Sequence, residues 1–67
     1  MSMPTQPQTP KPGETWIMNV DGKLSDGITP IISGTAVLIQ EVNGSNVTYQ
    51  VVSTGLVGYA NVADLRP

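Results

Sequence analysis

The chain has 67 residues, enough for one small domain, and carries three basic against five acidic side chains for a net charge of −2 at pH 7. Nucleic-acid binding depends on phosphate neutralisation by Lys and Arg, so this composition argues against a nucleic-acid partner. His and Cys are both absent, which excludes disulfides, His-dependent nucleophilic triads and the usual zinc sites. We therefore expect no metal or other cofactor.

The N-terminal segment, residues 1–12 (MSMPTQPQTPKP), holds four of the six prolines and little apolar mass. Each proline removes a backbone donor, and a segment with few apolar side chains cannot offset the entropy lost on ordering. We predict a disordered Pro-rich arm here, followed by one folded domain over residues 13–67. The functional alternative is a Pro-rich ligand for the aromatic groove of another protein.

The first predicted strand covers residues 14–20, ETWIMNV, in which alternate side chains share a face. Trp16, Met18 and Val20 fall on one of these faces. A large aromatic ring contributes most to so small a core, so Trp16 is expected to anchor it. The alternative places the same ring in a ligand groove.

A long irregular loop is predicted next, over residues 21–32. Two Asp-Gly turn pairs, beginning at Asp21 and Asp26, mark its first half. In the second half, Pro30 lacks the backbone donor that a central strand needs, so residues 28–32 are expected to form an edge or bulged segment.

The remainder of the chain, from residue 34 to residue 67, predicts three antiparallel strands joined by two tight turns. The Asn43-Gly44 pair favours a type I′ turn, which needs positive φ at both central residues. No ten-residue window has a helical apolar period, so the predicted fold class is all-β. The strands are expected over residues 35–42, 46–53 and 56–62, with a second turn at Thr54-Gly55 and a 3₁₀ turn at residues 63–65.

One set of residues between residue 19 and residue 67 matches the pattern of a known family: Gly34, Thr35, Val37, Ile39, Tyr49, Val51, Gly58, Tyr59 and Leu65. Through these residues the chain resembles bacterial SH3-type domains. The Trp that this family usually carries after the Asn-Gly turn is absent, and Ala60 replaces the usual Val. The resemblance implies a small SH3-like five-stranded barrel of bacterial or phage origin that binds cell-wall peptides or partner proteins. The expected core is Trp16, Met18, Val37, Ile39, Val47, Tyr49, Val51, Val57 and Leu65.

The closing run, GLVGYANVADLRP, is similar to the last strand of the plasmid-type (type II) dihydrofolate reductases through Val62, Ala63 and Leu65. That family also consists of small SH3-like barrels with a flexible arm, and it builds one active pore from four chains. Its pore is lined by a V-Q-I-Y motif, where this chain has Val57-Gly58-Tyr59-Ala60. The similarity therefore implies the fold and a homo-oligomer, while the Gln and Tyr of the motif are missing.

These observations favour a non-catalytic module that binds a protein, peptide or cell-wall ligand through its long first loop. We expect the site between the loop at residues 21–32 and the turn at residues 43–45. The predicted ligand-binding residues are Trp16, Asp26 and Tyr59, and no catalytic residue is predicted.

Two alternatives belong to other functional classes. One is an oligomeric pore-type enzyme like the reductases above, and the other is a structural subunit that docks through Ile28, Ile31 and Ile32. No apolar run approaches the ~20 residues of a membrane span, and the N-terminus has no export signal. We therefore expect a soluble chain without membrane insertion, with the cytoplasm slightly favoured as its compartment.

Overall fold

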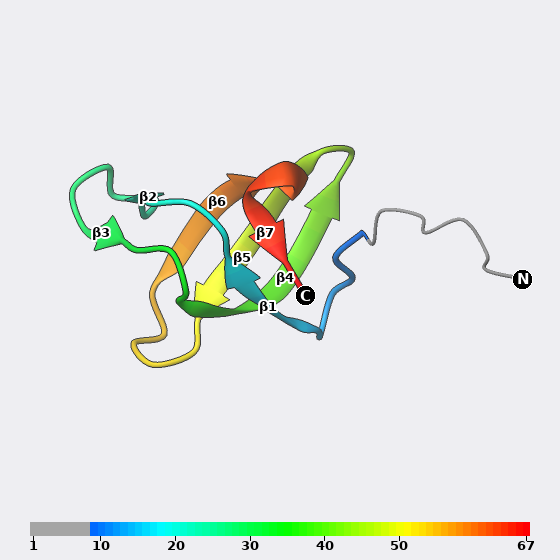
Figure 1. Ribbon diagram of the computed structural model, residues 1–67, viewed down its shortest axis with the longest axis horizontal. Coiled ribbons are helices and arrows are strands. Elements are labelled where there is room, and N and C mark those ends of the chain that lie inside the picture. Colours follow the sequence, from blue (N-terminus) through cyan, green and yellow to red (C-terminus); the bar gives the residue numbers. More distant parts are fainter. Residues whose placement is uncertain (1–8) are drawn as a thin grey trace, which may run out of the picture.

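The computed structural model describes residues 9–67, so the prediction of a disordered arm lies, for residues 1–8, outside the described residues. The strands are β1 (Thr15–Met18), β2 (Gly22–Lys23), β3 (Pro30–Ile31), β4 (Ala36–Asn43), β5 (Asn46–Val51), β6 (Val57–Asn61) and β7 (Leu65–Arg66), and a 3₁₀ turn, η1 (Val62–Asp64), precedes β7. They form a five-stranded antiparallel sheet in the order β6-β5-β4-β1-β7 and a separate two-stranded sheet of β2 and β3 (Figure 1). No α-helix occurs within residues 9–67, and the all-β prediction is confirmed.

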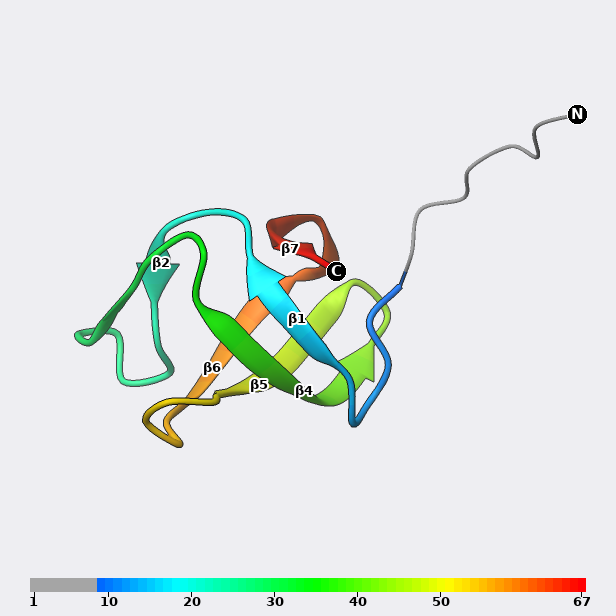
Figure 2. The same ribbon diagram turned by 60° about the horizontal axis from the view of Figure 1, so that its bottom comes forward.

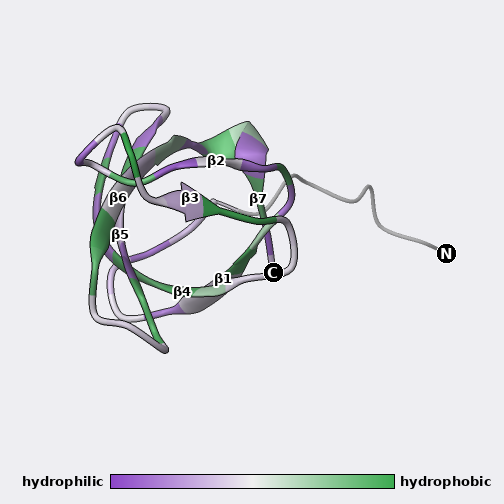
Figure 3. Ribbon diagram, turned by 90° about the vertical axis from the view of Figure 1, so that its left-hand side faces the viewer, coloured by the Kyte–Doolittle hydropathy of each residue, from purple (hydrophilic) through white to green (hydrophobic). Residues whose placement is uncertain are grey.

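The β4–β5 hairpin is the centre of the main sheet. Its alternating apolar residues place Val37 and Ile39 of β4 opposite Val51 and Tyr49 of β5, and all four side chains are buried. A bulge between Ile39 and Glu41 shifts the register by one residue in the second half of the hairpin. Figure 3 views the molecule from one end and shows the strands of the main sheet curving around a common interior.

The turn between β4 and β5 differs from the predicted type. Asn43 pairs with Asn46, so the two central residues are Gly44 and Ser45 rather than Asn43 and Gly44. Of these two central residues only Gly44 has a positive φ, at 63°, because no residue other than glycine adopts a positive φ in the described part of the chain. A type I′ turn needs two positive φ values, whereas type II′ has glycine at the first central position, so the turn fits type II′.

The first strand ends earlier than predicted. After Met18, hydrogen bonds to two other segments hold the chain: Met18 C=O accepts from Gly34 N–H at 2.7 Å, and Asn19 N–H donates to Asp64 C=O at 2.8 Å. The chain then leaves the sheet, and Val20 is exposed instead of sharing the buried face of Trp16. β1 pairs with β4 on one side and with β7 on the other.

The predicted irregular loop contains a short two-stranded ribbon, defined here as residues 22–31. β2 and β3 pair only with each other. Leu24 and Ile31 of this ribbon are buried in the core, so Ile31 is not part of an exposed docking edge, although Ile28 and Ile32 are exposed. The confinement of Pro30 to a two-residue strand agrees with the predicted edge segment.

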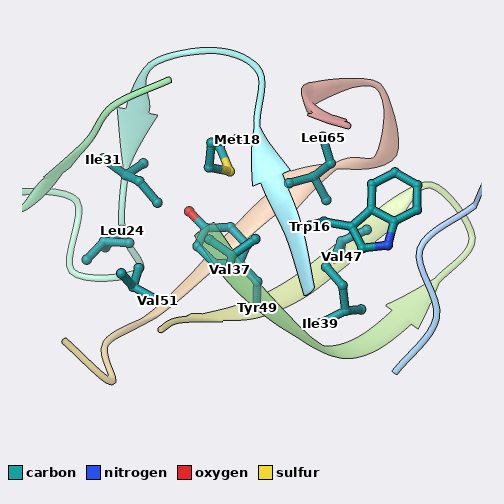
Figure 4. Close-up of a cluster of buried hydrophobic side chains, with 10 residues drawn as sticks. All are labelled: Trp16, Met18, Leu24, Ile31, Val37, Ile39, Val47, Tyr49, Val51 and Leu65. Carbon is teal, nitrogen blue, oxygen red and sulfur yellow. The ribbon is translucent and has the colours of Figure 1, made fainter. Parts of the chain in front are cut away.

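Ten apolar side chains form the core (Figure 4). The prediction of Val57 as a core residue is wrong, because this residue begins the edge strand β6 and is only half-buried. The sequence patterns did not predict Leu24 and Ile31 as core residues, and the ribbon contributes both side chains to the core. The core residues are Trp16, Met18, Leu24, Ile31, Val37, Ile39, Val47, Tyr49, Val51 and Leu65.

The segment before β1 packs against the sheet from Pro10 onward. Pro10 is among the fully buried side chains. Gly13 N–H donates to Ile39 C=O, and Ile39 N–H donates to Glu14 C=O, both at 2.8 Å. These bonds extend the β1–β4 pairing, so the last residues of the predicted arm pack against the domain. Within residues 9–67 no helix is long and apolar enough to cross a membrane.

Candidate functional site

The three residues predicted to bind a ligand do not converge. Trp16 is buried in the core, Asp26 lies in the exposed part of the ribbon, and Tyr59 projects from β6 with 65% of its surface exposed. The two segments expected to enclose the site also lie apart. Figures 1 and 2 show the ribbon at one end of the main sheet and the β4–β5 turn at the other, so no site forms between them.

Trp16 has a structural role. Its ring is only 4% exposed, and its indole Nε1–H donates to the Oε1 atom of Glu14 at 3.2 Å. The same oxygen accepts from the backbone N–H of Lys11 at 2.9 Å. The Glu14 carboxylate thus connects the segment before β1 to the buried Trp16. A buried ring whose N–H already has an acceptor offers little surface to a ligand.

Asp26 is used within its own loop. Its carboxylate accepts from the Thr29 hydroxyl and from the backbone N–H groups of Ile28 and Thr29, the last two at 2.8 Å. The Thr29 hydroxyl is the main cause that holds the pKa of Asp26 below its usual value, followed by the two backbone donors. This is the chemistry of a loop-closing Asp, so the ribbon's tip depends on its charge.

Tyr59 stands on the free edge of the main sheet. Val51 N–H donates to Leu56 C=O at 2.7 Å, so Val51 and Leu56 form a hydrogen-bonded pair. Such pairs alternate along an antiparallel ladder, so the N–H and C=O groups of Val57, Tyr59 and Asn61 point away from β5. Ser25 N–H donates to the outward C=O of Val57, and the Asp64 carboxylate accepts from the outward N–H of Asn61. Outward backbone groups of the edge are therefore bonded within the chain on both sides of Tyr59, which blunts this edge.

A different site lies between the ribbon and the turn at residues 52–56. Here the chain forms a pocket of about 260 Å³, which we call the apolar pocket. Its floor is made of core side chains, and its rim carries Ile32 and Leu56, which are 65% and 47% exposed. The pocket is lined by Leu24, Thr29, Pro30, Ile31, Ile32, Thr35, Val51, Ser53, Thr54 and Leu56.

The lining of the apolar pocket determines which chemistry it suits. It includes no charged side chain, and its polar groups are Ser and Thr hydroxyls. Exposed apolar side chains beside a hollow gain most when an uncharged apolar group covers them. The sequence offered one signal for this site, since Ile32 is an apolar residue at the end of the predicted loop and Leu56 is one directly after the predicted turn at Thr54-Gly55.

Within residues 9–67 no group of three or more His, Cys, Asp or Glu side chains lies close enough to hold a metal ion. The comparisons of this chain with protein-family models, with curated proteins and with solved structures found no match. The apolar pocket, with its exposed aliphatic side chains at Ile32 and Leu56, is the candidate functional site.

Proposed function

We propose that residues 13–67 form an SH3-like barrel that acts as a non-catalytic binding module for a protein or peptide. The strand order β6-β5-β4-β1-β7, the long loop after β1 and the 3₁₀ turn before β7 support the SH3-like part of this proposal. The long first loop and the small turn before the last strand are features that the resemblance to bacterial SH3-type domains implies.

One observation carries the binding function: two exposed aliphatic side chains, Ile32 and Leu56, stand on the rim of the apolar pocket. Exposure of an aliphatic side chain to water is unfavourable by roughly 25 cal/mol per Å² of apolar surface, relative to burial of the same surface. A partner that inserts an apolar side chain between these two residues recovers this free energy. The hydroxyls of Ser53 and Thr54, on the side of the pocket opposite the ribbon, can donate to the partner's backbone. Those of Thr29 and Thr35 already donate to Asp26 and to Ile32 C=O, and can only accept.

The occupant we propose is an uncharged apolar side chain of a peptide in extended conformation. The absence of charge in the lining disfavours an acidic or basic anchor, because a charge buried there would have no partner. A pocket of about 260 Å³ holds one such side chain together with part of its backbone.

Two isoleucines of the same loop provide a matched test. Ile32 lines the apolar pocket, while Ile28 is still more exposed, at 78%, and does not line it. Peptides selected from a random display library against the wild-type domain should lose at least about tenfold in affinity for Ile32→Ser and none for Ile28→Ser. Equal affinities for both variants, measured by calorimetry, would place binding elsewhere and refute the proposed site.

The second candidate is an enzyme whose site is shared between copies of the chain. The observation that favours it is the exposed Tyr59 on the edge strand β6, within the stretch that aligns with the reductase pore motif. It requires an assembly in which Val57–Asn61 of several copies face one axis. Light scattering at two protein concentrations tests this: a tetramer that persists on dilution supports the shared site, and a monomer removes it.

A further inference from the structure

The Tyr49 hydroxyl is a buried polar group that the fold does not use. The side chain is fully buried, and its hydroxyl has no hydrogen-bond partner among residues 9–67. Native proteins leave few such groups unpaired, because the solvation lost on burial is not replaced. A tyrosine hydroxyl keeps its proton at neutral pH and can donate, and burial raises the pKa of Tyr49 further above its ordinary value.

The hydroxyl points to the side of the core that the ribbon covers. Figure 4 shows the Tyr49 oxygen directed toward Met18 and toward the part of the cluster formed by Leu24 and Ile31. Leu24 and Ile31 also line the apolar pocket. These two ribbon side chains therefore belong both to the pocket and to the part of the core toward which the hydroxyl points.

The ribbon is only lightly attached to the main sheet. β2 and β3 pair with each other and with no other described strand. The backbone of the ribbon bonds β6 through Ser25 N–H, which donates to Val57 C=O at 3.2 Å. The hydrogen bonds of Asp26 stay within the ribbon. Elements held by few bonds and few buried side chains open at the lowest free energies.

We propose that the ribbon is a flap, and that its displacement joins the apolar pocket to the Tyr49 hydroxyl. The enlarged site takes a ligand with an apolar body and one hydrogen-bond acceptor, such as a peptide carbonyl. Tyr49 then donates to this carbonyl and adds a buried hydrogen-bond donor to a pocket whose other polar side chains are Ser and Thr. This inference rests on the proposed function and adds to it the chemical class of the ligand.

Two small probes separate the polar from the apolar part of the site. Toluene and acetophenone share an aromatic body of a size that the pocket admits, and only acetophenone has a carbonyl. Nuclear magnetic resonance titrations of the ¹⁵N-labelled protein give both affinities. Tyr49→Phe is the test variant, and Tyr59→Phe, which removes an exposed hydroxyl, is the matched control.

Wild type should bind acetophenone about three- to tenfold more tightly than toluene, the effect of one hydrogen bond. This preference should vanish in Tyr49→Phe and persist in Tyr59→Phe, with the affinity for toluene the same in all three proteins. Acetophenone should also shift the amide signals of Ser25 and Gly58, where the flap meets β6, and toluene should not.

The outcomes distinguish this inference from the proposed function. If toluene binds at Ile32 and Leu56 while acetophenone binds wild type and Tyr49→Phe equally, the flap is refuted and the apolar pocket remains. If neither probe shifts any signal of the pocket residues in the wild-type protein, the pocket itself is refuted, and the flap with it.

Discussion

Gly58 lies directly opposite Tyr49 in the β5–β6 pair, and the tyrosine ring covers the place that a side chain at Gly58 would fill. A Cβ atom built there would come within 2.8 Å of ring atom Cε1 and closer still to Cζ and the hydroxyl. An aromatic ring that packs over a glycine on an edge strand restores the contact that the missing side chain would make. The two residues thus form one packing unit.

Gly58→Ala should therefore destabilise the domain. The new methyl group collides with a buried ring that has no free space to enter, and overpacking of this kind costs about 1–3 kcal/mol. Urea unfolding followed by circular dichroism measures the change. The control is Gly22→Ala, where the nearest atom, Cγ2 of Ile31, lies at an ordinary 3.9 Å. Equal stability of the two variants would contradict the packing unit.

Tyr49→Phe should raise the stability of the ligand-free domain. An unpaired buried hydroxyl costs about 1–3 kcal/mol, and its removal leaves the ring and its contact with Gly58 in place. A gain of about 1 kcal/mol corresponds to a thermal midpoint higher by roughly 4–8 °C for a domain of this size. A lower midpoint in thermal unfolding would show that the hydroxyl has a partner in solution.

Trp16→Ala should leave the chain largely unfolded. Loss of a buried aromatic ring costs about 3–5 kcal/mol, which equals the roughly 3–5 kcal/mol that the core of so small a domain supplies. Tyr59→Ala, which removes an exposed aromatic ring, should change stability by no more than about 0.5 kcal/mol. Circular dichroism and unfolding of both variants test the contrast, and a folded Trp16→Ala protein would contradict it.

The ribbon should loosen at low pH through Asp26. Since folding lowers the pKa of this carboxyl, its contribution to stability is fully present above about pH 3.9, the unfolded value, and is lost as the pH falls through the lower folded pKa. Thr29→Ala removes the main cause of the shift and should move the Asp26 midpoint up toward 3.9. Carboxyl ¹³C titration measures this midpoint.

Thr54→Ala is the control for this titration, because the Thr54 hydroxyl bonds Leu56 N–H and not Asp26. The Asp26 midpoint should be the same in this variant as in wild type. A midpoint unchanged in Thr29→Ala would instead show that the backbone donors of Ile28 and Thr29 alone hold the carboxylate.

Local patterns in the sequence predicted the strands well, because their signals are contained in a few neighbouring residues. The alternation around Val37 and Tyr49 and the glycine turns at Gly44 and Gly55 all mark elements that the structure contains. The type of the β4–β5 turn was not predictable in the same way. The bulge after Ile39 shifts the pairing by one residue, and a period of two does not reveal a bulge.

Local patterns could not predict the candidate site, because it brings together segments that are distant in the sequence. Leu24 and Ile31 lie among turn residues without periodicity, and their burial follows from the ribbon's place over the end of the core. The apolar pocket forms only where the ribbon meets the turn at residues 52–56. An aromatic residue type, the signal at Trp16 and Tyr59, does not by itself distinguish a core residue from an exposed one.

The burial of Pro10 has a consequence for handling the protein. With this side chain packed and Gly13 bonded to Ile39, the shortest fragment that keeps these contacts begins at Pro10 and not at Gly13. A tag or fusion partner joined directly before Glu14 would remove these contacts from the start of β1. Joined before Pro10, it leaves them intact, on the side of the molecule away from the apolar pocket (Figure 2).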